Sequence, residues 1–165
     1  MVNAQNIIDE KKQRENKEKV MNKIFVDTQD INLNEWKSDS INEIAVALCE
    51  VQKELDGVAK NQTNSFYGKN GKPTYADLHA VQSSVYPIIT KYGLSVTQGN
   101  QVVQGAVVVT TTLLHTSGQW LRSAVKLPLE KYTAQGVGGA ITYGRRYGLS
   151  AIIGTAQYDA DGNNC

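Results

Sequence analysis

The sequence has little of what marks membrane, secreted or metal-binding proteins. It has no stretch approaching the roughly 18 uninterrupted apolar residues of a membrane span. Its N-terminus has no basic segment followed by an apolar run, so we expect no secretory signal. Cys49 and Cys165 are too few and too far apart for a zinc site or a disulfide framework. These absences predict a protein of a reducing, cytosolic compartment.

Acidic residues are scarce between residues 58 and 158. This region has 9 Lys and Arg but only Asp77 and Glu130 as acids, whereas residues 1–57 have 8 Lys and Arg against 12 Asp and Glu. The last seven residues add Asp159 and Asp161. A basic body with acidic ends indicates a polyanionic partner, with ordinary solvation of the surface as the alternative.

The length of 165 residues and the 41% hydrophobic content suit one folded domain. Residues 1–39 are polar and have too few apolar side chains for a core of their own, so we expect an N-terminal arm or helix there. Residues 40–158 are the expected core domain, and residues 159–165 are an acidic C-terminal tail.

Apolar spacing predicts two helices in the first half of this core. The first begins at a capping box, Ser40 with Glu43, and continues to Gly57. Residues 58–73 combine basic, aromatic, glycine and proline residues and are expected to form a loop. The second helix covers about residues 75–92 and is kinked or split by Pro87.

Three β-like segments and a third helix follow. A strand is predicted at 94–98, followed by a turn at Gly99 and Asn100. The alternative is that the strand resumes at residues 102–103. Residues 106–114 are predicted to be a central strand buried on both faces, and residues 119–127 to be the third strand. The last helix covers 134–153 and is capped by Gly154. The predicted fold is therefore α+β, a three-stranded antiparallel β-meander packed by helices.

The last helix divides into two faces on a helical wheel. Five glycines fall between residues 136 and 148, and each costs about 1 kcal/mol relative to alanine in a helix, which indicates a very close backbone contact. The predicted packing face is small and aromatic, and the opposite face is polar. The packing face holds Ala140, Gly144, Tyr147, Gly148 and Ala151; the polar face holds Gln135, Gly138, Thr142, Arg145 and Leu149, with Arg146 at its margin.

Two arginine and lysine sets are candidates for phosphate binding. Arg145 and Arg146 are suited to it because a planar guanidinium group binds two oxygens at once; surface arginines paired with carboxylates are the alternative. On the third strand, Arg122 and Lys126 share a face with Trp120, whose ring could stack on bases or belong to the core. Basic and aromatic residues extend into the loop at Lys60, Phe66, Tyr67, Lys69 and Lys72.

Catalytic motifs are missing. The glycine-rich segment lacks the Lys-Ser/Thr pair of a phosphate-binding loop and the third glycine of a dinucleotide fingerprint. His79 and His115 are isolated, and no serine or cysteine has a base near it in the sequence. Asp159-Ala-Asp-Gly-Asn-Asn resembles the start of a calcium loop without its glutamate. We expect no enzyme activity, no cofactor and no metal.

Seven short segments occur along the chain in this order: Leu48–Gln52, Lys60–Asn64, Tyr75–Leu78, Tyr92–Gln98, Leu114–Gly118, Gly139–Leu149 and Asp159–Gly162. Together they resemble the essential recombination function (ERF) family of phage single-strand annealing proteins over about residues 41–163. The family's usual ending is three aspartates before a glycine, and here Ala160 replaces the middle one.

The resemblance implies an ATP-independent protein of a phage or prophage that binds single-stranded DNA and anneals it in the cytoplasm of a bacterial host. It implies a β-β-β-α core that assembles through its sheet and helices into a ring or helical filament. DNA would lie in a basic groove between the sheet and helix of successive subunits. The implied partners are single-stranded DNA, the annealed duplex intermediate, other copies of the chain, and a host or phage single-strand binding protein.

By position in the family's segments, Arg145 and Arg146 would contact the phosphate backbone, helped by Lys60, Arg122 and Lys126. Tyr75, Thr142 and Tyr143 would be groove residues. Two other functions stay open at this point: passive single-stranded DNA binding without annealing, and an oligomeric scaffold that binds RNA or an acidic protein.

Overall fold

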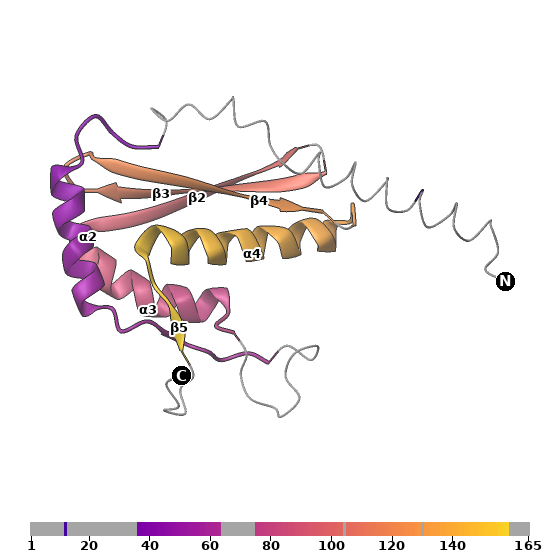
Figure 1. Cartoon of the computed structure of the whole chain (residues 1–165), viewed down its shortest axis with the longest axis horizontal. Helices are drawn as coiled ribbons and strands as arrows, with labels where there is room; N and C mark the ends of the chain where they lie inside the picture. The colour runs from indigo at the N-terminus through magenta and orange to yellow at the C-terminus, as the bar shows by residue number, and fades with distance from the viewer. Residues whose placement is uncertain (1–11, 13–35, 64–74, 104, 130, 159–165) are drawn as a thin grey trace. The chain divides into compact units, whose positions relative to one another are not determined.

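A three-stranded antiparallel sheet forms the centre of the fold (Figure 1). The computed structural model describes residue 12 and residues 36–63, 75–103, 105–129 and 131–158. All of these except Lys12 belong to one compact unit, Leu33–Cys165. β2 (Leu94–Val103), β3 (Ala106–His115) and β4 (Trp120–Pro128) follow one another in sequence and in space. The predicted α+β fold with a β-meander is confirmed.

Three helices lie against one face of this sheet (Figure 1). α4 (Ala134–Ile153) runs beneath β3 and β4, while α3 (Leu78–Lys91) lies beyond α4 and also contacts β2. α2 (Asn42–Glu54) packs at one end of the sheet. α4 has the predicted limits, and the left-handed Gly154, with φ of 78°, is its predicted C-cap.

The start of α2 differs from the predicted capping box. The N-cap residue is Ile41, which makes no side-chain cap, so the expected Ser40–Glu43 box is wrong. Gln119, just before β4, supplies the cap instead: its Oε1 accepts hydrogen bonds from the backbone N–H of Glu43 (2.9 Å) and Ile44 (3.0 Å). This contact satisfies two of the open N–H groups of the helix and ties α2 to the sheet.

Several predicted boundaries change because long-range pairing overrides local preference. Gly99 and Asn100 do not form a turn; they pair with Thr110 and Val109 inside a continuous β2, and the reversal falls at Gly105, with φ of 83°.

α3 is one helix that contains Pro87 and begins after Asp77. The expected loop after α2 contains β1 (Val58–Ala59), which pairs in parallel with β5 (Gln157–Tyr158). Residues 64–74 of that loop lie outside the described residues.

The predicted packing face of α4 is only partly correct. Gly144 and Gly148 are buried against β3, as expected, but Tyr147 and Ala151 are exposed. Leu149 and Arg146, expected on or beside the polar face, are buried. The wheel assumed one packing face, whereas α4 packs against the sheet on one side and against α3 on the next.

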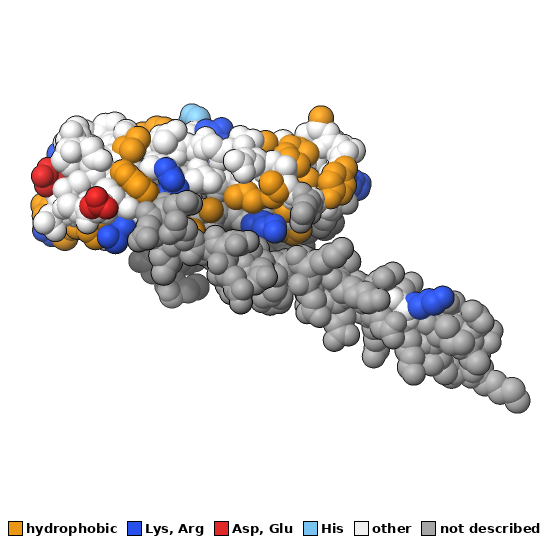
Figure 2. Space-filling model, turned by 90° about the horizontal axis from the view of Figure 1, so that it is seen from above, with side chains coloured by type: hydrophobic (Ala, Val, Ile, Leu, Met, Phe, Trp, Pro, Cys, Tyr) orange, Lys and Arg blue, Asp and Glu red, His pale blue; other side chains and the backbone are white. Residues whose placement is uncertain are grey.

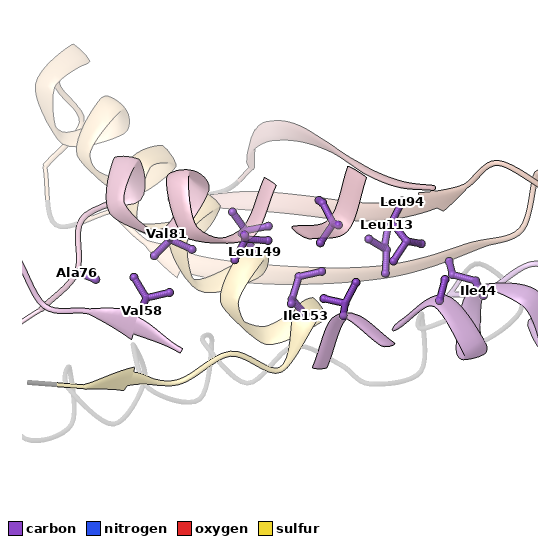
Figure 3. Packing of buried hydrophobic residues seen from close by; sticks show 12 residues of the cluster. Ile44, Val58, Ala76, Val81, Leu94, Leu113, Leu149 and Ile153 are labelled. Atoms are coloured by element: carbon purple, nitrogen blue, oxygen red, sulfur yellow. The ribbon is translucent and has the colours of Figure 1, made fainter. Parts of the chain in front are cut away.

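The hydrophobic core lies between the helices and the inner face of the sheet (Figure 3). Ile44 of α2 meets Leu94 and Leu113 of the sheet, and Leu149 and Ile153 of α4 extend this cluster towards Val58, Ala76 and Val81. β3 is the central strand, but it is not buried on both faces. Its residues Val108 and Thr110, on the face away from α4, are half-buried.

Replacement of Gly144 tests the close contact between α4 and β3. A Cβ atom there would lie 2.5 Å from Val109 Cγ2 and 3.2 Å from Leu127 Cδ1. Overpacking costs about 1–3 kcal/mol, which outweighs the gain of about 1 kcal/mol in helix propensity, so Gly144→Ala should lower the urea midpoint. A Cβ at Gly138 meets nothing within 4 Å, so Gly138→Ala should raise the midpoint. Equal effects of the two substitutions would contradict the packing.

Candidate nucleic-acid interface

The face of the sheet that points away from α4, here called the outer sheet face, holds one of the two predicted basic sets. Val109 and Thr111 contact the glycines of α4, so the alternate residues of β3 point to the other side. The strand register places Arg122 opposite Thr112, and Lys126 opposite Val108. Arg122 and Lys126 are both exposed, and they therefore lie together on the outer sheet face.

Arg122 is held in place by two neighbours on this face. Its guanidinium carbon lies 4.7 Å from the centre of the Trp120 ring, and its Nε donates to Thr112 Oγ1 at 3.1 Å. Trp120 is half-buried and lies on the outer sheet face rather than in the core cluster. The result is a cation and an aromatic ring stacked on an exposed strand, a pairing that suits a single nucleic-acid strand.

Residues before α2 reinforce the edge of β4 beside this pair. The Arg122 N–H donates to the Trp36 carbonyl oxygen at 2.7 Å, and the Ser38 N–H donates to the Trp120 carbonyl oxygen at 3.0 Å. Lys37 forms a β-bridge with Leu121. These backbone contacts fix the strand on which Arg122 and Trp120 stand.

Negative charge is kept away from the sheet. Residues 94–128 contain no Asp or Glu, so the three strands carry only positive side-chain charge. Figure 2, which views the molecule from the sheet side, shows Lys and Arg along this face and Asp and Glu only at the end where α2 lies. A surface that carries only positive charge attracts a polyanion, and no acid on the three strands neutralises its cations.

Arg146 lies in a different place from the one expected. Its side chain is only 6% exposed, and its guanidinium carbon is 4.7–5.0 Å from the ring centres of Tyr75, Tyr143 and Tyr147, here called the tyrosine cage. Nη1 donates to the Ala76 carbonyl oxygen at 2.9 Å, and Nη2 to the Tyr147 hydroxyl at 3.3 Å. The rings and the carbonyl stabilise the buried cation, and Arg146 links α4 to the segment before α3.

A small pocket opens beside the tyrosine cage. It has a volume of about 110 Å³ and brings together the three predicted groove residues, Tyr75, Thr142 and Tyr143. Its remaining lining residues are Asp77, Leu78 and Arg146. A larger hollow of about 540 Å³, lined in part by Lys131 and Gln135, shares Tyr143 with it.

The other two predicted residues lie elsewhere. Arg145 is half-buried, and its Nε donates to Gln98 Oε1 at 3.3 Å, while Gln98 Nε2 donates to the Arg145 carbonyl oxygen at 2.8 Å. Lys60 is half-buried directly after β1. The eight predicted residues therefore do not form one groove within a subunit, because the outer sheet face and α4 lie on opposite sides of the sheet.

Asp77 is a site residue that the sequence interpretation missed. It is the N-cap of α3: its Oδ1 accepts a hydrogen bond from the Ala80 N–H at 2.8 Å, and its Oδ2 accepts one from Gln62 Nε2 at 3.0 Å. An aspartate before an apolar helical segment is an ordinary N-cap signal. The signal was overlooked because the helix was expected to start at Tyr75.

Residues 44–165 match the model of the ERF superfamily, and the chain belongs to this family. At the family level, this membership indicates single-strand annealing in phage recombination. Comparisons with curated proteins and with solved structures found no match. Within the described residues, none of the helices has both the length and the apolar character needed to cross a membrane.

The Asp77 cap predicts a dependence of stability on pH. The Ala80 N–H, followed by the side chains of Asn61 and Gln62, holds the pKa of Asp77 below its ordinary value of about 3.9. Because the pKa is lower in the folded state, the ionised carboxylate stabilises the fold at pH values above its unfolded-state pKa. This stabilisation is lost as the pH falls through the folded-state pKa. Asp77→Ala should therefore cost about 1 kcal/mol at pH 7, and this difference should shrink below about pH 4.

Urea unfolding of both proteins at neutral and acidic pH measures this difference. A difference that stays constant on acidification would show that the carboxylate charge does not contribute.

Proposed function

We propose that the chain binds single-stranded DNA on its outer sheet face and anneals complementary strands without ATP. The observation that carries this proposal is the exposed Arg122 stacked on the half-buried Trp120, with the exposed Lys126 on the same face and no acid on the strands. Family membership supports it independently.

The side chains of the outer sheet face suit binding of single-stranded DNA without preference for its base sequence. Arg122 and Lys126 can neutralise phosphates, and the Trp120 ring offers a surface on which any base can stack. The neighbouring Thr110 is half-buried on the same face, and its hydroxyl can hydrogen-bond phosphate or sugar oxygens without selecting a base, whereas the buried Thr112 holds Arg122 in place. A strand held mainly by its backbone leaves base edges free to test a complement, as annealing requires.

Assembly of several copies explains the positions of the remaining predicted residues. Arg145 and Lys60 are not on the outer sheet face, so in one subunit they are secondary to Arg122 and Lys126. In a ring or helical filament, the outer sheet face of one copy and the α4 side of the next can border the same strand, and weak contacts then add along the DNA. The proposed setting is a phage or prophage protein in the host cytoplasm, with a single-strand binding protein as a further partner.

Salt dependence tests the proposed contacts of Arg122 and Lys126. Each phosphate contact on a single strand contributes about 0.7 to the slope of log affinity against log salt concentration. Arg122→Gln and Lys126→Gln should each weaken binding of an oligothymidine and reduce the slope by roughly that amount, measured by fluorescence anisotropy.

Lys53→Gln is the matched control, because Lys53 is an exposed cation on α2 that pairs with Glu50 at 2.7 Å. Its slope should equal that of the wild type. Unchanged slopes for both Arg122 and Lys126 would remove the outer sheet face as the DNA site.

An annealing assay separates the proposal from passive binding. Two complementary fluorescent oligonucleotides should pair faster in the presence of the chain, with no nucleotide added, whereas a passive binder would slow their pairing. Competition by RNA and by duplex DNA in the same assay addresses the scaffold alternative. Stronger competition by RNA than by single-stranded DNA would contradict the proposed ligand.

A further inference from the structure

We propose that the pocket beside the tyrosine cage binds one unstacked pyrimidine base of the DNA strand. This inference rests on the proposed binding of single-stranded DNA and adds a base site on the α4 side of the fold. It changes the role of Tyr75, Thr142 and Tyr143 from general groove residues to the walls of a defined pocket.

The size of the pocket limits what it can hold. Its volume of about 110 Å³ is below the roughly 300–1,000 Å³ of pockets that enclose a whole small-molecule ligand. A complete nucleotide is therefore too large, and a single flat ring is the better match. This favours a pyrimidine over the double ring of a purine.

The walls of the pocket are those that an unstacked base requires. Tyr75 and Tyr143 supply aromatic surface, Leu78 supplies apolar contact, and the Arg146 guanidinium is a flat cation held among the rings. Proteins hold splayed-out bases in this way, by stacking them on tyrosine rings and guanidinium planes. Tyr143 is 46% exposed, so a base can reach its ring from solvent.

The charges argue against a phosphate in this pocket. Arg146 is buried and already donates to the Ala76 carbonyl and the Tyr147 hydroxyl. Asp77 also lines the pocket, and its carboxylate, which is negatively charged at neutral pH, would repel a phosphate. A neutral base meets no such repulsion.

The polar groups of the pocket complement the edge of a pyrimidine. Thr142 Oγ1 donates to the Gly138 carbonyl at 2.9 Å, which leaves its lone pairs as acceptors. Arg146 has five N–H groups, and the two bonds named above use two of them within the described part of the chain. Thymine and cytosine each present both acceptors and a donor, so either can use these groups.

The test compares oligonucleotides that have the same phosphates but different bases. Three strands of equal length are needed: one fully abasic, one abasic with isolated thymines restored, and one abasic with isolated adenines restored. Isolated bases cannot stack on neighbours within the free strand. We expect wild-type protein to bind the thymine strand about tenfold more tightly than the adenine strand, because an adenine can stack on Trp120 but does not enter the pocket, and the abasic strand least tightly of the three.

Tyr143→Ala and Tyr147→Ala form a matched pair of variants. Both rings contact Arg146 and are 46% and 45% exposed, but only Tyr143 lines the pocket. Tyr143→Ala should abolish the advantage of the thymine strand over the adenine strand, while Tyr147→Ala should retain this advantage. Thermal unfolding of both variants checks that they lose similar stability.

Each alternative outcome has a definite meaning. Equal binding of thymine and abasic strands by the wild type, or loss of the thymine advantage in both variants, overturns the base pocket but leaves DNA binding standing. Equal gains from adenine and thymine overturn the preference for a single ring. Failure of the wild type to bind any strand, an intact oligothymidine included, overturns the proposed function itself.

Discussion

The contact between α4 and β3 is the constraint on which the rest of the structure depends. Gly144 and Gly148 lie where a Cβ atom would meet Val109 and Thr111, so the helix backbone rests almost directly on the central strand. The missing side chains cost helix propensity, and burial of the core between α4 and the sheet offsets that cost. Because α2, α3 and α4 all cover one face, Trp120, Arg122 and Lys126 lie on the other face of the sheet.

The same contact also determines the environment of Arg146. With Gly144 and Gly148 turned towards the sheet, the next side of α4 faces α3 and the residues before it, and Arg146 points there. Within the described residues, Arg146 donates to the Ala76 carbonyl and the Tyr147 hydroxyl rather than to a carboxylate, although Asp77 lines the same pocket. Three tyrosine rings and a carbonyl oxygen take the role of a carboxylate. The rings and the carbonyl thus stabilise the buried cation.

Local signals in the sequence predicted the three core helices and the three strands of the central sheet, but neither β1 and β5 nor the contacts between distant segments. Gly154 and the spacing of apolar residues defined α4, and the β-branched run at 106–114 defined the central strand. The cap of α2 by Gln119 joins positions 75 residues apart, and the pairing of Val58 with Gln157 spans an even longer separation, so no local pattern could reveal either. The candidate site shows the same difference between local and long-range signals. The alternation of side chains along one strand predicted that Arg122 and Lys126 share a face. The burial of Arg146 depends on contacts with Tyr75 and Ala76, which belong to a distant segment of the chain.

The central claim is that the outer sheet face is where single-stranded DNA lies, and lysine footprinting tests it most directly. The reactivity of each lysine towards an acylating reagent would be compared with and without an oligothymidine. The account predicts that DNA protects Lys126 and leaves Lys53 and Lys91, which pair with Glu50 and Glu54 of α2, unchanged. Unchanged reactivity of Lys126 under conditions where the DNA is fully bound would contradict it.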